Sequence, residues 1–286
     1  MGEEKGGFMT YDVIGAGALN YAPCRYGNSR VLYRGPERRL DVPYVAFIGG
    51  TDTYGKFINA PFPALVESDI GLNCVNFGIA NAGLDVFLND GFVMDAVNGS
   101  EKTVLQVLGA QNMSNRFYSV HPRRNDRFVK ASPILSSIFP EVDFSEFHFT
   151  RHMLNALYQV SDERFSLVQN ELQTAWSARM KLLLQRMDEG VVLLWFADHS
   201  PTEDNSQVVN PADCSDPMFV TRGMLDNLRA HVVDFVEVRA SQDALNAGTE
   251  GMVFGEMETI AAGKIMGPRA HGEVALHLGR ALHAIL

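Results

Sequence analysis

A chain of 286 residues with 46% apolar and 20% charged residues can bury a sizeable core, which excludes an intrinsically disordered protein. The formal net charge of −10 argues against a general nucleic-acid binder, because such a protein needs a basic face against the phosphates. No apolar run approaches the roughly eighteen residues of a membrane span, and the N-terminus, MGEEKGGF, lacks the apolar core of a secretory signal. Widely spaced Cys24, Cys74 and Cys214 fit buried thiols in a reducing compartment, so we expect a cytoplasmic protein without membrane or nucleic-acid partners.

Residues 1–42 are predicted to form an N-terminal arm. Gly15 and Gly17 follow a short apolar run, as in a dinucleotide-binding fingerprint. However, Asn20 stands at the third glycine position and Pro23 interrupts the helix that would bind the pyrophosphate. We therefore expect no cofactor. Four of the five arginines of the arm are either solvated, ion-paired or part of an anion site: Arg30, Arg34, Arg38 and Arg39.

The stretch YVAFIGGTDTYG, residues 44–55, is the centre of the pattern. Its apolar run ends in two glycines, which is typical of a buried parallel strand that enters a loop. In open α/β sheets, ligands bind beyond the carboxyl ends of the strands, so Thr51 occupies a position suited to a reactive side chain. The alternative is a glycine turn that Thr51 and Asp52 only cap.

Four further apolar runs predict strands at residues 72–79, 103–109, 191–200 and 232–238. Helices are predicted between and after them at residues 61–69, 145–158, 161–187, 218–230 and 271–286. Alternation of this kind predicts an α/β fold, a three-layer α/β/α sandwich with a mainly parallel sheet of about five strands. We expect one domain over residues 43–286, with an irregular insertion or lid at about 115–150.

Four sequence blocks resemble those of the SGNH (GDSL-like) hydrolases, in the same order. GGTDTYG, residues 49–55, is similar to G-D-S-x-T-x-G and puts Thr51 at the nucleophilic serine. NFGIANAG, residues 76–83, looks like the second block, with Gly78 at the oxyanion glycine. LGAQN, residues 108–112, is similar to G-x-N-D, and the oxyanion asparagine falls on Gln111 or, one residue on, Asn112. PRAHGEVALHLGRAL resembles the D-x-x-H block before a terminal helix, with His271 at the base.

The resemblance to a divergent, uncharacterised bacterial branch of this superfamily implies a flavodoxin-like strand order. It also implies an esterase or acyltransferase that acts on a small ester, such as an O-acetylated carbohydrate. Thr51 would attack, His271 would take the proton, and Gly78 with Gln111 or Asn112 would stabilise the oxyanion.

Two departures from the family pattern keep a second function open. Thr51 is a secondary alcohol, and Pro268 stands where an aspartate orients the histidine. Asp198, Glu256 or Glu258 are the candidates to replace that aspartate. The alternative is a catalytically impaired protein that binds a carbohydrate or another small polar ligand. A homo-oligomer is compatible with either reading.

The remaining candidate groups each have a plain alternative. Asp198 and His199 follow the fourth predicted strand and either line the site or form a surface turn. A metal site that combines them with His121 lacks close ligand spacing, so we expect no metal. Three arginines in the insertion suggest a weaker third function, transfer from a sulfate or phosphate ester: Arg123, Arg124 and Arg127.

Overall fold

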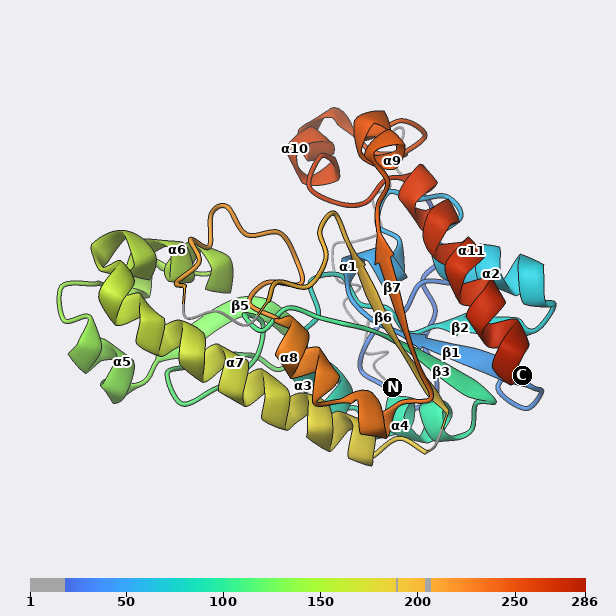
Figure 1. Cartoon of the computed structure of the whole chain (residues 1–286), viewed down its shortest axis with the longest axis horizontal. Helices are drawn as coiled ribbons and strands as arrows, with labels where there is room; N and C mark the ends of the chain where they lie inside the picture. The colour runs from blue at the N-terminus through green and yellow to red at the C-terminus, as the bar shows by residue number, and fades with distance from the viewer. Residues whose placement is uncertain (1–18, 189, 204–206) are drawn as a thin grey trace, which may run out of the picture.

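The computed structural model describes residues 19–188, 190–203 and 207–286. At its centre is a five-stranded sheet in the order β2-β1-β3-β6-β7 (Figure 1). All four pairings in this sheet are parallel. Taken in chain order within the sheet, this is the 2-1-3-4-5 arrangement of flavodoxin-like folds, which confirms the expected order. The strands are β1 (Tyr44–Ile48), β2 (Asn73–Asn76), β3 (Lys102–Gln106), β6 (Val191–Ala197) and β7 (Asp234–Arg239).

Helices cover both faces of the sheet, which confirms the three-layer prediction (Figure 1). Alternate side chains of β1 point to opposite faces, so Val45 and Phe47 join one apolar cluster and Ala46 and Ile48 join the other. The first cluster includes residues of α2 (Phe62–Ile70), α9 (Gln242–Ala247) and α11 (Pro268–Ile285). The second includes residues of α3 (Leu84–Leu88), α4 (Gly91–Asn98), α6 (Thr150–Val160), α7 (Asp162–Gln185) and α8 (Arg222–Asp226).

The amphipathic stripe of α7 is core, as predicted. Ser161 caps the helix by accepting from the Arg164 N–H at 3.2 Å. The stripe is buried from Phe165 to Leu183. Within it, the Trp176 indole Nε1–H donates to the Leu108 carbonyl at 2.7 Å. This bond attaches α7 to the loop that follows β3.

Trp176→Phe is expected to lower the free energy of unfolding by about 1–3 kcal/mol, because the buried Leu108 carbonyl loses its donor. Urea unfolding followed by circular dichroism measures the change. Thr174→Ala, on the exposed face of the same helix, serves as the control. A Trp176→Phe variant as stable as this control would mean that water replaces the indole donor.

Residues 115–150 contain a β-hairpin where the sequence indicated an irregular segment. The hairpin pairs β4 (Tyr118–His121) with β5 (Arg124–Ala131), and register shifts on either side of Val120 break the alternation that marks a strand. The hairpin is followed by α5 (Pro133–Ile138) and η1 (Phe144–Glu146), so the next long helix, α6, begins at Thr150 instead of 145. The remaining short helices are α1 (Thr51–Tyr54), η2 (Arg229–His231), η3 (Glu256–Glu258) and α10 (Thr259–Ala262).

Arg34 attaches the N-terminal segment to the turn after β1. Its buried guanidinium donates to the backbone carbonyls of Tyr54, Gly55, Ile58 and Asn59. Two of the other arginines named above form ion pairs, Arg38 with Glu67 and Arg39 with Asp41. Arg34, Arg38 and Arg39 therefore bind the protein's own groups, and Arg30 is exposed.

Gly15 and Gly17, the start of the glycine pattern, lie outside the described residues. Within the described ranges, none of the helices combines the length and the apolar character that crossing a bilayer requires.

Candidate functional site

The buried side-chain amide of Gln106, at the end of β3, helps to hold the turn after β1. Its Oε1 accepts from the Gly50 N–H at 3.1 Å, from the Thr53 N–H at 3.2 Å and from the Thr53 hydroxyl at 2.6 Å. A side chain at Gly49 would bring a Cβ within 2.0 Å of the Thr53 hydroxyl oxygen, so only glycine fits there. Together these contacts set Thr51 at the start of α1, beyond the carboxyl end of the strand and partly exposed.

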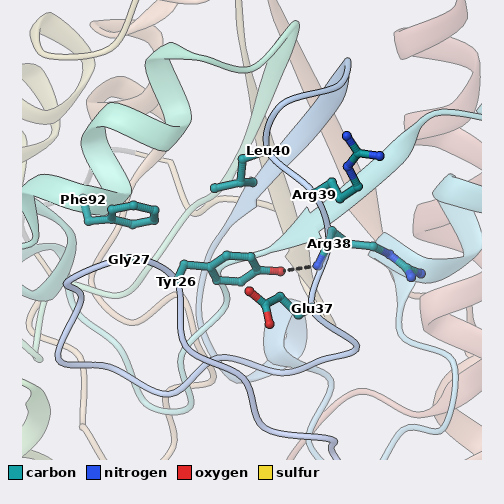
Figure 2. A pocket seen from close by; sticks show the side chains of 7 residues that line it. All are labelled: Tyr26, Gly27, Glu37, Arg38, Arg39, Leu40 and Phe92. Carbon is teal, nitrogen blue, oxygen red and sulfur yellow. Dashed lines mark hydrogen bonds between the residues drawn. The ribbon is translucent and has the colours of Figure 1, made fainter.

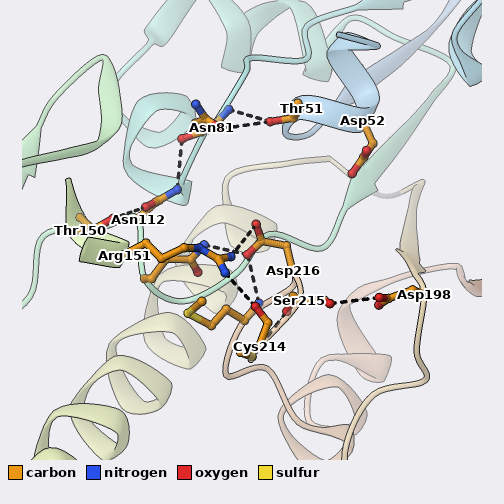
Figure 3. Close-up of polar contacts among 12 residues, drawn as sticks. Thr51, Asp52, Asn81, Asn112, Thr150, Arg151, Asp198, Cys214, Ser215 and Asp216 are labelled. Atoms are coloured by element: carbon orange, nitrogen blue, oxygen red, sulfur yellow. Dashed lines mark hydrogen bonds and ion pairs between the residues drawn. The ribbon is translucent and has the colours of Figure 1, made fainter. Parts of the chain in front are cut away.

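The Thr51 hydroxyl belongs to a chain of polar contacts across the loops (Figure 3). Thr51 Oγ1 accepts from the Asn81 N–H at 3.0 Å and lies 3.3 Å from Asn81 Oδ1. Asn112 Nδ2 donates to the Asn81 carbonyl at 3.3 Å, and Thr150 donates to Asn112 Oδ1 at 2.7 Å. Asn81 has a φ of 56°, in the left-handed region that asparagine tolerates better than most residues. The loops after β1, β2 and β3 therefore meet α6 at this end of the sheet.

A second polar group surrounds Asp216, in the loop between β6 and α8 (Figure 3). Gln111 Nε2 donates to one Asp216 oxygen at 2.8 Å, and the Arg151 guanidinium pairs with the other at 3.2 Å. Ser215 donates to Asp198 Oδ2 at 3.0 Å, and Asp198 Oδ1 lies 2.6 Å from His199 Nδ1. Asp198 and His199 thus form a pair that is partly open to solvent at the end of β6.

Asp52, the second residue of α1, has the most perturbed carboxyl group at this end of the sheet. Burial raises the pKa of Asp52 to about 6, and repulsion from the Asp216 carboxylate acts in the same direction. Hydrogen bonds from the Gln106 side-chain amide, at 3.3 Å, and from the Met266 N–H oppose the rise. A carboxyl group with this pKa exchanges its proton near neutral pH, which a proton-transfer residue requires.

His271 lies in a different environment from Thr51. It is fully buried on α11 and stacks against the Phe62 ring, with the Phe196 ring edge-on. Its Nδ1 accepts from the Phe62 N–H at 3.1 Å, which caps the first turn of α2, and its Nε2 has no partner among the described residues. Burial lowers the pKa of His271 to about 3, and the nearby Arg34 guanidinium adds to the effect. Among the described contacts, no hydrogen bond joins His271 to Thr51 or to a carboxylate.

The predicted oxyanion donors already have partners within the chain. The Gly78 N–H donates to Asn76 Oδ1 at 2.8 Å. The amide N–H groups of Gln111 and Asn112 donate to Asp216 and to the Asn81 carbonyl. The Gly78 bond has to open before its N–H can reach a ligand, whereas each side-chain NH2 group has a second N–H.

The geometry gives little support to a metal site or to an anion site at the arginines of the insertion. Where the structure describes the chain, no three His, Cys, Asp or Glu side chains gather closely enough to hold a metal ion. His121 Nδ1 instead accepts from the Arg123 and Arg124 N–H groups in the hairpin. The Arg127 guanidinium lies over the Phe149 ring, 4.0 Å from its centre.

A shallow pocket of about 380 Å³ shares no residue with these polar groups (Figure 2). Its apolar walls are Tyr26, Leu40 and Phe92. Its arginines, Arg38 and Arg39, are engaged in ion pairs with neighbouring carboxylates, and the Tyr26 hydroxyl accepts from the Arg38 N–H at 2.9 Å. The pocket thus has few polar groups left to recognise a ligand.

Comparisons with known proteins identify the family. A family model described as "Domain of unknown function (DUF6473)" matches residues 9–286. The chain belongs to this family. A search of the curated proteins finds no match for the DUF6473 chain.

Solved structures similar to the DUF6473 chain include three esterases or lipases. A lipase/acylhydrolase from Enterococcus faecalis is 9% identical, with 85% of this chain and 96% of that chain covered and a TM-score of 0.39. A carbohydrate esterase family 2 enzyme from Corynascus thermopiles is 12% identical, with 88% of this chain and 68% of that chain covered and a TM-score of 0.41. An acetyl xylan esterase from Butyrivibrio proteoclasticus is 9% identical, with 89% of this chain and 66% of that chain covered and a TM-score of 0.40. Similarities this distant assign no activity to the DUF6473 chain.

Several polar groups of this site escaped the sequence interpretation. The sequence pattern places Asp52 only in a turn and does not single out Asn81, Arg151 or Asp216. Asp52 and Asn81 do follow predicted strands directly, which was the available signal. Arg151 and Asp216 lie in a helix and a proline-containing loop, and only the tertiary fold brings them together.

Proposed function

We propose that the carboxyl end of this sheet binds a small ester rich in hydroxyl groups, such as an O-acetylated carbohydrate, and hydrolyses it with Thr51 as the attacking group. One observation carries the proposal: a partly exposed hydroxyl at the end of β1 lies among amides and carboxylates from four other segments. Amide side chains donate and accept, and carboxylates accept, so together they can pair with sugar hydroxyls, which do both. The block resemblance to SGNH hydrolases supports the same reaction class.

The charge of the site favours a neutral or cationic ligand over an anionic one. Asp52, Asp198 and Asp216 lie at this end of the sheet, and the Arg151 guanidinium is engaged by Asp216. This balance disfavours transfer from sulfate or phosphate esters. Transfer of the acyl group to a second alcohol instead of water stays within the proposal.

The position of His271 favours a second function, binding without turnover. The residue aligned with the family's general base caps α2 inside the core, so the hydroxyl–imidazole pair is not assembled. A chain that lost turnover in this way would keep the polar loops and bind a carbohydrate or another small polar ligand.

Thr51→Ala is expected to lower kcat/KM for short-chain aryl esters and acetylated sugars at least tenfold, because the variant lacks the attacking hydroxyl. Thr51→Ser should retain or exceed the wild-type rate, since a primary alcohol lacks the methyl group beside the oxygen. Steady-state hydrolysis by purified proteins measures both, with exposed Thr174→Ala as the control.

The outcomes separate the two functions. If Thr51→Ala hydrolyses the esters at the wild-type rate, the attacking role of this residue is overturned. No turnover with any ester, combined with calorimetric binding of an acetylated sugar that Thr51→Ala weakens, would establish the binding function instead.

A further inference from the structure

We propose that Asn81 is the positioning residue of the attacking hydroxyl at this site, and that Asp126, near the turn of the β4–β5 hairpin, sets the direction of the Asn81 amide. The inference rests on the proposed function and brings into the site a hairpin that the block resemblance does not include. Thr51 and Asn81 follow β1 and β2, whereas Asp126 belongs to β5.

Asn81 holds the Thr51 hydroxyl from two sides (Figure 3). Thr51 Oγ1 accepts from the Asn81 backbone N–H at 3.0 Å and donates to Asn81 Oδ1 at 3.3 Å. A hydroxyl group carries one proton and two lone pairs. These two bonds occupy the proton and one lone pair, so the second lone pair is the one left to attack an ester carbonyl carbon. One residue thereby fixes the orientation of the attacking group before a substrate arrives.

Asp126 decides which end of the Asn81 amide faces Thr51. Asn81 Nδ2 donates to Asp126 Oδ2 at 3.5 Å. An ionised carboxylate only accepts hydrogen bonds, so the NH2 end of the amide must face Asp126 and the oxygen end must face Thr51. With an oxygen on that side, the Thr51 hydroxyl has to be the donor. Burial raises the pKa of the Asp126 carboxyl, and the Arg127 guanidinium opposes the rise.

The hairpin is attached to the loop that carries Asn81. Asn125, which precedes Asp126, is buried, and its Oδ1 accepts from the Gly83 N–H at 3.0 Å and from the Val86 N–H at 3.1 Å. These two bonds join the start of β5 to the chain just after Asn81. The hairpin therefore holds the Asp126 carboxylate at a set place beside the Asn81 amide.

Asn81→Gly is expected to lower kcat for short-chain aryl esters at least tenfold and to change KM less than twofold. Glycine keeps the backbone N–H and adopts the left-handed φ of 56° without strain, so only the side-chain oxygen is lost. A fall in kcat alone reports on the orientation of the attacking group, whereas a loosened binding loop would raise KM. Exposed Asn227→Gly, at the end of α8, is the matched control.

An exchange of side chains tests the role of Asp126. Asn81→Asp puts a second carboxylate against that of Asp126, so kcat should fall at least tenfold. Addition of Asp126→Asn reverses the polarity of the contact, because the carboxylate at position 81 then accepts both from Thr51 and from the amide at position 126. The double variant should recover kcat to within about threefold of wild type, with exposed Asp95→Asn as the control. A double variant as slow as Asn81→Asp alone would overturn the role of Asp126.

A second readout does not depend on turnover. Thr51→Val keeps the shape of the side chain but removes its oxygen, so the Asn81 amide proton should exchange with solvent at least tenfold faster than in wild type. Hydrogen exchange followed by NMR measures the change, and the Ala82 N–H, which donates to the Ile79 carbonyl at 3.1 Å, is the internal reference. Unchanged exchange of the Asn81 proton would overturn the contact on which the inference rests.

The kinetic outcomes separate the inference from the proposed function. Hydrolysis that depends on Thr51 but proceeds with wild-type kcat in Asn81→Gly would overturn the inference and leave the proposed function standing. Absence of turnover in wild type would overturn both.

Discussion

His271→Ala is expected to lower the free energy of unfolding at pH 7 by about 3 kcal/mol, because it removes a buried ring and a helix cap together. The imidazole stacks on Phe62 and accepts from the Phe62 N–H, so the variant leaves both a cavity and an unpaired donor at the start of α2. Urea unfolding followed by circular dichroism measures the loss. His277→Ala, at an exposed position on the same helix, should change stability by less than about 0.5 kcal/mol.

The same histidine makes stability depend on pH in a defined direction. With a folded-state pKa of about 3 and an ordinary value of 6.5, the unfolded chain binds the extra proton between these two values. His271 therefore destabilises the fold as the pH falls below 6.5, by about 3 kcal/mol at pH 4. His271→Gln keeps an acceptor for the Phe62 N–H but cannot titrate, so its stability should decline less steeply over this range. A His271→Ala variant with wild-type stability and no hydrolysis would instead restore His271 as the base of the reaction.

Gly78→Ala is expected to cost about 3 kcal/mol of stability, through a steric clash and not through a lost oxyanion donor. An added Cβ would lie 2.3 Å from the Tyr54 nitrogen and 2.7 Å from the Thr53 carbonyl carbon. Both are backbone atoms of the α1 turn, so no flexible side chain can move to relieve the contact. Thermal or urea unfolding measures the effect.

Gly272→Ala is the matched control for this prediction. Gly272 lies within α11, and its added Cβ would meet nothing within 4 Å. Alanine is the better helix former by about 1 kcal/mol, so this variant should be neutral or more stable. A Gly78→Ala protein that unfolds like wild type but hydrolyses esters more slowly would contradict the packing role and support the oxyanion role.

The central sheet was predictable because buried parallel strands leave a strong sequence signal. The apolar runs from 44–48 and 191–197 are buried along their full length, and polar residues follow each within three positions at the same edge. The hairpin after β3 was not predictable in the same way, because its register shifts disrupt the alternation and part of it is exposed. The helix after β6 was predicted too long, since Thr221 caps it and it ends at Asp226.

The candidate site was partly predictable for the same reason. Thr51, Gln111, Asn112 and Asp198 all follow strands of one parallel sheet, so the fold brings their loops to one end. The environment of His271 was readable from helix periodicity, because it shares the buried face of α11 with residues at three- and four-residue spacing: Val274, Ala275, Leu278 and Leu282. The block resemblance implies a catalytic role for His271, whereas the helix pattern indicates that this residue belongs to the core.

The order of the strands also has a consequence for folding kinetics. β1, β2 and β3 pair among themselves within residues 44–106, whereas β6 and β7 extend the β3 edge only after more than eighty further residues. Two residues that face Asp52 also come late in the chain: Asp216 lies between β6 and β7, and Met266 follows β7. Parallel pairings at such sequence separations slow folding, because the loop entropy is lost before the contacts form. A nascent chain that ends before β6 therefore exposes the edge of β3 with which β6 later pairs. The environment of Asp52 is completed among the last events of folding.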